Sequence, residues 1–192
     1  LKMASTRVLG TESMNGDNKK GYYLGDGALF VYGTGQEYLN IFPVWDWRKV
    51  PGVTTYESDA VMPSLEKSYY PGNESDFVGG ISDGKQGLSV MELKRDGLTV
   101  RKYCLFTPEA LVVLGSGIQS DSLLPVTTSI EQCWAEDKAE VWIDGGWKKL
   151  ESRQTFVQKG LRVLHGQKGY IIPEGQCVAE VENRTGRWND IM

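Results

Sequence analysis

The chain has 192 residues, of which 40% are hydrophobic, and its formal net charge at pH 7 is −4. That length and apolar content suffice for one domain with a substantial core. The negative charge argues against a general nucleic-acid binder, which would carry a basic face. No run approaches the ~20 apolar residues that a membrane-spanning helix needs. We therefore expect neither nucleic acid nor a membrane as a partner.

The segment 12–27 is strongly polar and is interrupted by glycines. Its polar residues include Glu12, Asn15, Asp17, Asn18 and Asp26. An unpaired polar group buried in a core costs on the order of 1–3 kcal/mol, so the segment is predicted to be either a solvent-facing loop or a binding site. Asn15-Gly16 is typical of a turn corner, and an Asp before Gly, such as Asp26, is typically a turn former.

The segment 38–56 alternates large aromatic side chains with polar and charged ones. Trp45 and Trp47 flank Asp46, and Arg48 and Lys49 follow directly. On a strand, both indoles would point to the same side. There they would fit either the core of a sandwich or a platform that stacks against sugar rings. The two cations beside them keep the binding interpretation open.

The rest of the chain is predicted to form short strands separated by turns, since apolar residues do not recur at the helical period. The expected strands are 27–32, 87–94, 98–106, 110–115, 126–133, 139–143, 161–165, 170–172 and 177–182. Tight hairpins are predicted at Arg95-Asp96-Gly97 and at Asp144-Gly145-Gly146, because Asp and Gly tolerate positive φ. The segment 54–77 is predicted to be irregular.

The patterning of these strands predicts a layered fold. Neither face of 98–106 is cleanly polar, and 112–118 is apolar on both sides. Strands covered on both faces belong to stacked sheets rather than to one exposed sheet. The predicted fold class is therefore all-β and antiparallel, with two or more stacked sheets.

The cysteines are predicted to be structural, and the single histidine limits the metal sites that this chain can form. Cys104, Cys133 and Cys177 lie far apart and show no metal-ligand spacing, so we interpret them as buried thiols. His165 is the only histidine, which excludes a site built from a pair of histidines within this chain.

Ordered pieces of the chain resemble the β-sandwich of polysaccharide lyase family 8, whose members cleave chondroitin and hyaluronan. The pieces are ESMNGDN, KGYYLGDGALFVY, EYLNIFPVWDWRKVPGVTTY, VRKYCLFTPEALVVLGSGI, TTSIEQC, LHGQKGYIIPEGQ and GRWNDI. The resemblance implies an antiparallel multi-sheet super-sandwich of the galactose mutarotase type, incomplete in this chain. Residues 1–192 are expected to be a single β-sandwich domain of a longer lyase, whose N-terminal helical toroid is absent here. The opening Leu1-Lys-Met-Ala agrees with that expectation.

The resemblance also implies a reaction, β-elimination at a uronic acid of an acidic polysaccharide. A base removes the C5 proton, the substrate carboxylate is neutralised, and the leaving oxygen receives a proton. In the family, most of the groups that do this lie in the toroid, and the sandwich contributes a Glu and, three residues later, an Asn. These match Glu12, as the catalytic carboxylate that orients a partner, and Asn15, as a substrate contact. This chain alone is expected to be inactive.

Other residues follow from the resemblance as candidates for substrate binding or for a metal. Asn18, Trp45, Trp47 and Arg48 are predicted to contact substrate. Some family members hold calcium near the aromatic segment, which makes Asp46 a weak calcium candidate. However, Arg48 stands where a second acid would help, so no cofactor is expected. The parent protein is expected to be secreted or periplasmic.

Two other functions remain open from the sequence. A non-catalytic carbohydrate-binding module would expose an aromatic strip formed by Tyr38, Trp45 and Trp47. A glycoside hydrolase would pair two acids, such as Glu12 and Asp26, roughly 5–10 Å apart across a groove.

Overall fold

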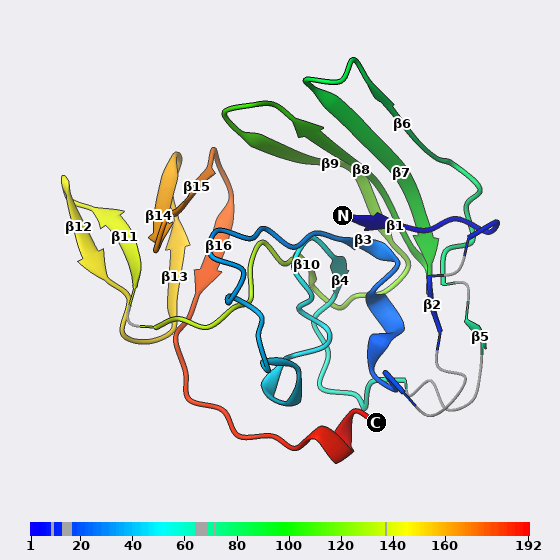
Figure 1. Cartoon of the computed structure of the whole chain (residues 1–192), viewed down its shortest axis with the longest axis horizontal. Helices are drawn as coiled ribbons and strands as arrows, with labels where there is room; N and C mark the ends of the chain where they lie inside the picture. Colours follow the sequence, from blue (N-terminus) through cyan, green and yellow to red (C-terminus); the bar gives the residue numbers. More distant parts are fainter. Residues whose placement is uncertain (9, 13–16, 64–68, 71, 137) are drawn as a thin grey trace. The chain divides into compact units, whose positions relative to one another are not determined.

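The computed structural model describes residues 1–8, 10–12, 17–63, 69–70, 72–136 and 138–192. Antiparallel strands make up almost all of its regular structure, and the three helical elements of the described residues are single 3₁₀ turns (Figure 1). The predicted all-β antiparallel class is confirmed. No helix in the described part of the chain is long and apolar enough to cross a membrane.

The chain divides into two compact units. Unit 1 comprises Leu1–Phe30, Trp45–Gln132 and Arg187–Met192, and unit 2 comprises Val31–Val44 and Cys133–Gly186. The elements of unit 1 are β1 (Lys2–Met3), β2 (Thr11–Glu12), η1 (Gly21–Tyr23), β3 (Asp26–Ala28), β4 (Thr54–Tyr56), β5 (Tyr69–Tyr70), β6 (Val78–Ser82), β7 (Gly87–Arg95), β8 (Leu98–Phe106), β9 (Leu111–Ser120), β10 (Val126–Thr128) and η3 (Trp188–Asp190).

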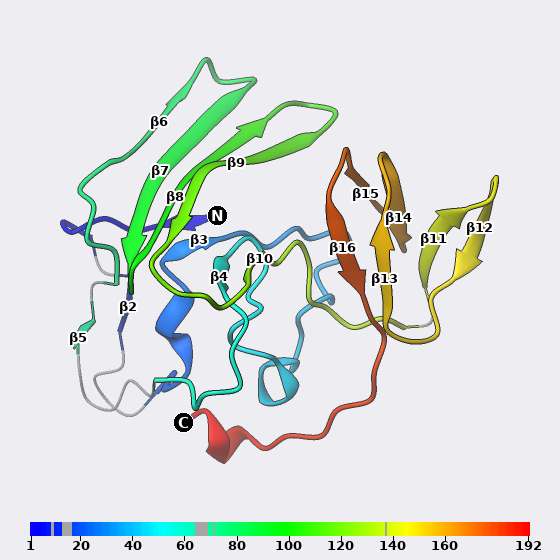
Figure 2. The ribbon, with the colours of Figure 1, turned by 180° about the vertical axis from the view of Figure 1, so that it is seen from behind.

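A four-stranded sheet in the order β6-β7-β8-β9 is the largest element of unit 1. Seen from behind, β6 and β9 again lie at its two edges (Figure 2). Alternate residues of β7 and β8 point to one face, where Met91, Leu93, Leu98 and Val100 form a buried cluster. Each such side chain contributes roughly 1.5–3 kcal/mol relative to an exposed one.

The β7–β8 hairpin has the predicted turn. Asp96 and Gly97 adopt φ values of 53° and 76°, so both central residues lie in the left-handed region that a tight hairpin requires. Full register follows on either side of the turn, from Arg95↔Leu98 to Gly87↔Phe106.

Strand β9 differs from the sequence prediction. Its apolar run was expected to be covered on both faces, yet Val113 and Leu114 are 41% and 59% exposed. An edge strand has a neighbour on one side only, so its side chains lose the contacts that flank β7 and β8.

Unit 2 contains η2 (Phe42–Val44), β11 (Ala139–Ile143), β12 (Gly146–Lys149), β13 (Gln154–Val157), β14 (Leu161–His165), β15 (Lys168–Ile172) and β16 (Gln176–Ala179). Its four-stranded sheet has the order β12-β11-β14-β15, and β13 pairs with β16. The buried cluster Val141, Leu150, Phe156 and Leu161 forms its core. The predicted β11–β12 turn is confirmed, with Asp144 at φ 52° and Gly145 at φ 81°.

Two predicted strands are much shorter in the structure. The strand expected at 27–32 is β3, which ends at Ala28, after which the Leu29 amide donates to the Pro51 carbonyl. The strand expected at 126–133 is β10, which ends at Thr128. Both ends are set by contacts with the loop around residues 50–53, which local patterning does not encode.

The thiols and the histidine have structural roles. All three cysteines are free, with Cys104 buried and the other two half-buried. Burial raises the pKa of the Cys104 and Cys177 thiols above their ordinary value. His165 Nε2 lies 3.0 Å from the Ala135 carbonyl oxygen and its Nδ1 lies 3.5 Å from Cys133 Sγ, so both ring nitrogens contact the protein.

Candidate functional site

Strand β2 carries Glu12 at its end. The backbone of Glu12 pairs with Tyr69, and Thr11 pairs with Tyr70, in a two-stranded sheet with β5. The side chain of Glu12 and the whole of Asn15 lie outside the described residues. The assignment of these two residues to catalysis and substrate binding therefore stays a prediction.

Asn18 helps to fix the turn that follows β2. It adopts φ 55°, and its Nδ2 donates to Thr11 Oγ1 at 3.3 Å. Its carbonyl oxygen accepts a hydrogen bond from the Gly21 amide at 3.1 Å. A Cβ at Gly21 would overlap the Asn18 side-chain amide, so a larger residue there would displace this amide. The amide of Asn18 thus joins the end of β2 to the start of η1.

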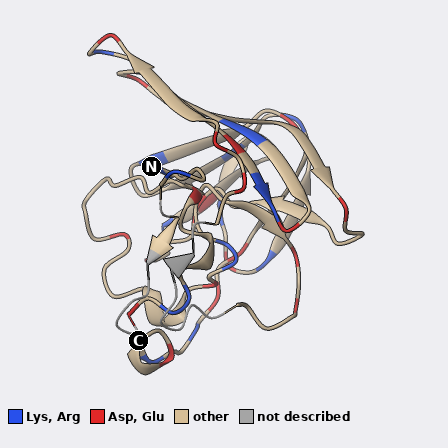
Figure 3. Cartoon of the chain, turned by 90° about the vertical axis from the view of Figure 1, so that its right-hand side faces the viewer, with Lys and Arg blue, Asp and Glu red and all other residues tan. Residues whose placement is uncertain are grey.

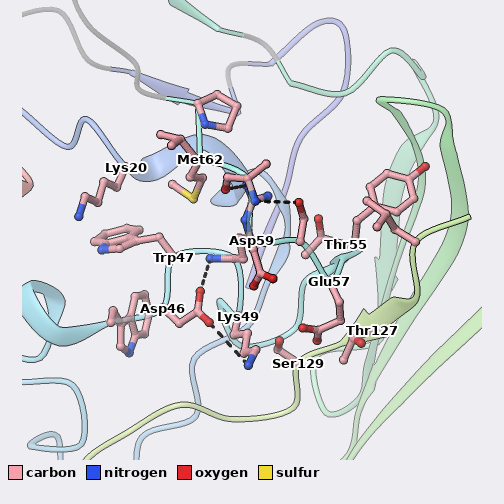
Figure 4. Close-up of a pocket in the computed structure, with 18 of the residues that line it drawn as sticks. Lys20, Asp46, Trp47, Lys49, Thr55, Glu57, Asp59, Met62, Thr127 and Ser129 are labelled. Carbon is pink, nitrogen blue, oxygen red and sulfur yellow. Dashed lines mark hydrogen bonds and ion pairs between the residues drawn. The ribbon is translucent and has the colours of Figure 1, made fainter. Parts of the chain in front are cut away.

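A pocket with a volume of about 860 Å³ lies in unit 1 beside the aromatic segment. In Figure 4, Asp46 and Trp47 lie across it from Thr55 and Thr127, which belong to the small β4–β10 sheet. Among the described residues that line it, the cationic ones are Lys19, Lys20, Arg48 and Lys49, and the acidic ones are Asp46, Glu57, Asp59 and Asp190. The structure therefore brings together two pairs of cations that are far apart in the sequence.

Charges of both signs are also interspersed over the chain as a whole, as Figure 3 shows for the described residues. The pocket likewise has both cations and acids among its lining residues. At a net charge of −4, the long-range field of this chain repels a polyanion. Any recognition of an acidic ligand here depends on local contacts.

Trp45 and Trp47 are core side chains of unit 1. They are 6% and 7% exposed, and their rings meet edge to face at 5.4 Å between centroids. Phe30 stacks on Trp45, and Trp45 Nε1 donates to the Gln132 carbonyl at 3.1 Å. They were predicted to contact substrate. Their burial favours the core interpretation, since an indole that stacks on a sugar needs an exposed face.

Gln132 holds the aromatic segment in place, a role that the sequence did not reveal. Its Oε1 accepts a hydrogen bond from the Asp46 amide at 2.8 Å. Its Nε2 donates to the carbonyls of Asp46 and Lys49 at 3.0 and 2.9 Å. The Lys49 amide closes the turn by donating to the Asp46 carbonyl at 2.9 Å. One amide side chain thus matches three backbone groups of residues 46–49.

Arg48 contacts two separate segments of the chain beside this pocket. Its Nη1 donates to the Tyr23 hydroxyl at 3.2 Å, and its Nη2 donates to the Ala60 carbonyl at 2.7 Å. Its predicted role was contact with substrate. In the structure its guanidinium links η1 to the loop that follows β4.

The residues around Asp46 do not fit a calcium ion. Calcium takes six to eight oxygen ligands, but Asp46 Oδ1 accepts the Arg48 amide at 3.0 Å and Oδ2 lies 3.7 Å from Lys49 Nζ. In the described part of the chain, no group of three or more His, Cys, Asp or Glu side chains is arranged to hold a metal ion. No chemical step is assigned to a metal here.

Asp26 does not occupy a groove. It is 1% exposed and its Oδ2 lies 2.7 Å from Arg95 Nη1. Asp26 was predicted to form a turn, and a hydrolase would have used it as an acid facing a groove. The turn prediction is wrong because Asp26 lies in strand β3. The role of an acid facing a groove is also wrong for this residue, because its carboxylate forms a buried ion pair with Arg95, 69 positions away.

Comparison with known proteins decides the family. The family model described as polysaccharide lyase family 8, super-sandwich domain, matches residues 1–192. The chain belongs to polysaccharide lyase family 8.

Relatives of this family 8 chain include characterised lyases. Chondroitinase-AC of Pedobacter heparinus is 35% identical over 190 residues, which is 98% of this chain and 27% of the relative. Hyaluronate lyase of Staphylococcus aureus is 27% identical over 207 residues, covering 100% of this chain and 24% of the relative. The family 8 chain therefore spans about a quarter of the length of these relatives.

Solved structures agree with the fold of the family 8 chain. A chondroitinase AC lyase, studied as enzyme–oligosaccharide complexes, superposes with a TM-score of 0.89 at 34% identity, over 99% of this chain and 28% of that one. The Streptomyces coelicolor A3 chondroitin AC lyase in complex with chondroitin sulphate gives a TM-score of 0.76 at 29% identity, over 100% of this chain and 25% of that one. The predicted super-sandwich family is confirmed.

Proposed function

We propose that this chain is the β-sandwich part of a polysaccharide lyase that cleaves uronic-acid-containing glycosaminoglycans, such as chondroitin or hyaluronan, by β-elimination. The observation that carries the proposal is the TM-score of 0.89 to a chondroitinase AC lyase over 99% of this chain. The relatives named chondroitinase and hyaluronate lyase support the same substrate class.

In this proposal Glu12 is the orienting carboxylate of the reaction. A carboxylate within a few ångströms of a cation stabilises the charged form and fixes its geometry. Its position at the end of β2 gives its backbone a fixed partner strand, which is what a precisely oriented side chain requires. Asn15 contributes a neutral amide to the substrate, without the cost of burying a charge.

The base and the group that neutralises the substrate carboxylate come, in this proposal, from a helical toroid of the same parent polypeptide. The parent acts on an acidic polysaccharide outside the cytoplasm, in the periplasm or after secretion. Residues 1–192 supply one wall of the cleft, with Glu12 and Asn15 facing the toroid.

The proposal is tested in the full-length protein by following the ultraviolet absorbance of the unsaturated uronate with chondroitin or hyaluronan. We expect Glu12→Gln to lower kcat/KM by about 100-fold or more, because the oriented charge is lost while the shape is kept. The matched control is Glu109→Gln, an exposed carboxylate in the same unit, which should leave kcat/KM unchanged. Wild-type turnover in Glu12→Gln would contradict the proposed role of Glu12 as the orienting carboxylate.

The structure disfavours a simple carbohydrate-binding module as the alternative. That function needs an exposed aromatic strip, but Tyr38, Trp45 and Trp47 are 5%, 6% and 7% exposed. Glycan binding that survives Glu12→Ala and is lost in Trp45→Ala would nevertheless restore it, provided that circular dichroism shows the variant to be folded.

A further inference from the structure

Among the described residues, four carboxylates line the pocket beside the aromatic segment, and four cationic side chains line it with them. Asp46, Glu57 and Asp59 are three of these acids, and Arg48 and Lys49 follow Asp46 closely in the sequence. Figure 4 shows the Lys49 side chain joined to Asp46 by an ion pair and lying toward Glu57. The negative charge of these acids is thus partly balanced by cationic side chains of the same chain.

The carboxylate of Asp46 has both oxygens directed at N–H groups. Oδ1 accepts the Arg48 amide at 3.0 Å, and Oδ2 lies 3.7 Å from Lys49 Nζ. Its backbone is held in turn by Gln132, through hydrogen bonds to both its amide and its carbonyl. A metal ion on this carboxylate would have to compete with the Lys49 ammonium and the Arg48 amide for its negative charge.

The Arg48 guanidinium spans two segments that are far apart in sequence. Nη1 reaches the Tyr23 hydroxyl in η1 at 3.2 Å, and Nη2 reaches the Ala60 carbonyl after β4 at 2.7 Å. A phenol oxygen and a backbone carbonyl are uncharged acceptors, which a rigid guanidinium fork binds with defined geometry. Arg48 is therefore a charged cross-link between two loops that line or flank one pocket.

We propose that Arg48 is a built-in cation that holds these two segments together and keeps divalent metal ions out of the pocket, so that the site is independent of calcium. Two fixed positive charges, Arg48 and Lys49, repel a dication from the same carboxylates. Both carboxylate oxygens of Asp46, which such an ion would need as ligands, already face nitrogen groups of the chain. The pocket is cross-linked by an organic cation instead of a metal.

The cross-link also touches the element next to the proposed catalytic strand, because η1 lies against β2. If the pocket excludes calcium, the rate of elimination by the full-length protein should be unchanged by EDTA. This expectation rests on the proposed function. Metal binding and thermal stability are measured without any substrate, so failure of the proposed function would leave those two measurements intact.

The first experiment measures metal binding to the full-length protein with terbium(III), a calcium surrogate whose emission is excited through nearby indoles. Trp45 and Trp47 line this pocket, so an ion bound there would give sensitised emission that calcium competes away. We expect no emission that depends on Asp46. Sensitised emission in the wild type that Asp46→Asn abolishes would overturn the proposal. Emission unchanged by Asp46→Asn would arise elsewhere and would agree with it.

The second experiment changes Arg48 itself. Arg48→Met should lower the Tm of this part of the protein by about 5 °C, because 1 kcal/mol corresponds to roughly 2–4 °C in a domain of this size. Arg101→Met is the matched control, since Arg101 is exposed and, among the described residues, its side chain pairs with Glu92 alone, at 3.7 Å. The Tm of this variant should change by less than about 1 °C. An unchanged Tm in Arg48→Met would contradict the proposal that Arg48 holds the two segments together.

Arg48→Asp tests the exclusion of metal. It reverses the charge beside Asp46, and a folded variant should gain terbium emission that calcium competes away and that wild type lacks. A variant shown by circular dichroism to be folded, yet without that gain, would contradict the exclusion. If the variant does not fold, the wild-type and Asp46→Asn comparison decides the point.

Discussion

Asp26 and Arg95 form the most buried ion pair of the described residues, and their surroundings leave the pair incompletely satisfied. The side chains are 1% and 3% exposed, and Asp26 Oδ1 has no hydrogen-bond partner among the described residues. Arg95 also lies 3.7 Å above the Tyr22 ring, which offsets part of its desolvation. Burial raises the pKa of Asp26 from 3.8 to about 6, against the opposing effect of Arg95.

The raised pKa predicts a pH dependence of stability with a definite sign. Between pH 3.8 and about 6 the folded protein holds the Asp26 proton more tightly than the unfolded chain does, so stability falls as pH rises through that window. Relative to Asp26→Asn, the wild type should lose roughly 2 kcal/mol between pH 4 and pH 6. Urea unfolding of both proteins across this range measures the difference, in which the other carboxyl groups cancel. A difference that is flat or rises with pH would show that Arg95 dominates over burial.

A second prediction at the residue scale concerns Gln132, whose amide makes three hydrogen bonds to the backbone of residues 46–49. Gln132→Glu keeps the shape but turns a double donor into a carboxylate that faces two carbonyls. We expect it to cost about 2–4 kcal/mol, at least as much as Gln132→Ala, because an unsatisfied charged acceptor is worse than a missing one. Equilibrium unfolding in urea compares the two. If Gln132→Glu is as stable as the wild type, the three hydrogen bonds of the Gln132 amide contribute little to the free energy of unfolding.

At the scale of elements, the β7–β8 hairpin depends on one glycine. Gly97 has φ 76°, and a Cβ there would lie 3.2 Å from Asp121 Cβ. Gly97→Ala is therefore expected to lower the free energy of unfolding by about 1–2 kcal/mol. Gly79, on β6, is the control, because a Cβ there meets nothing within 4 Å and its φ is not positive. Gly79→Ala should be neutral or slightly stabilising. Equal losses in both variants would refute the turn argument.

The strands themselves were predicted well where their pattern is local. The bounds of β8, β11 and β14 agree with the predicted ranges 98–106, 139–143 and 161–165. Alternation of side chains and an Asp-Gly turn need only neighbouring residues to be recognised. The strand β6 was missed because two of the five residues of Val78–Ser82 are glycines, which leaves no clear apolar alternation.

At the scale of the whole molecule, this chain spans about a quarter of its relatives' length, and the proposed reaction needs groups from outside it. We expect isolated residues 1–192 to show no elimination of chondroitin or hyaluronan in the unsaturated-uronate absorbance assay, where the full-length protein turns over. The reason is that, in the proposed function, the base and the group that quenches the carboxylate belong to the toroid. Clear turnover by the isolated chain would contradict this division of labour.

The sequence by itself determined the all-β class, the two Asp-Gly hairpins and the resemblance to polysaccharide lyase family 8. Only the tertiary structure decided that Trp45 and Trp47 are buried, that Asp26 pairs with Arg95, and that Gln132 clamps the loop holding Asp46. The physical reason is range. Strand alternation and turn φ angles depend on residues next to each other, whereas these burials and hydrogen bonds join groups 69 to 87 positions apart, and only folding brings them into contact.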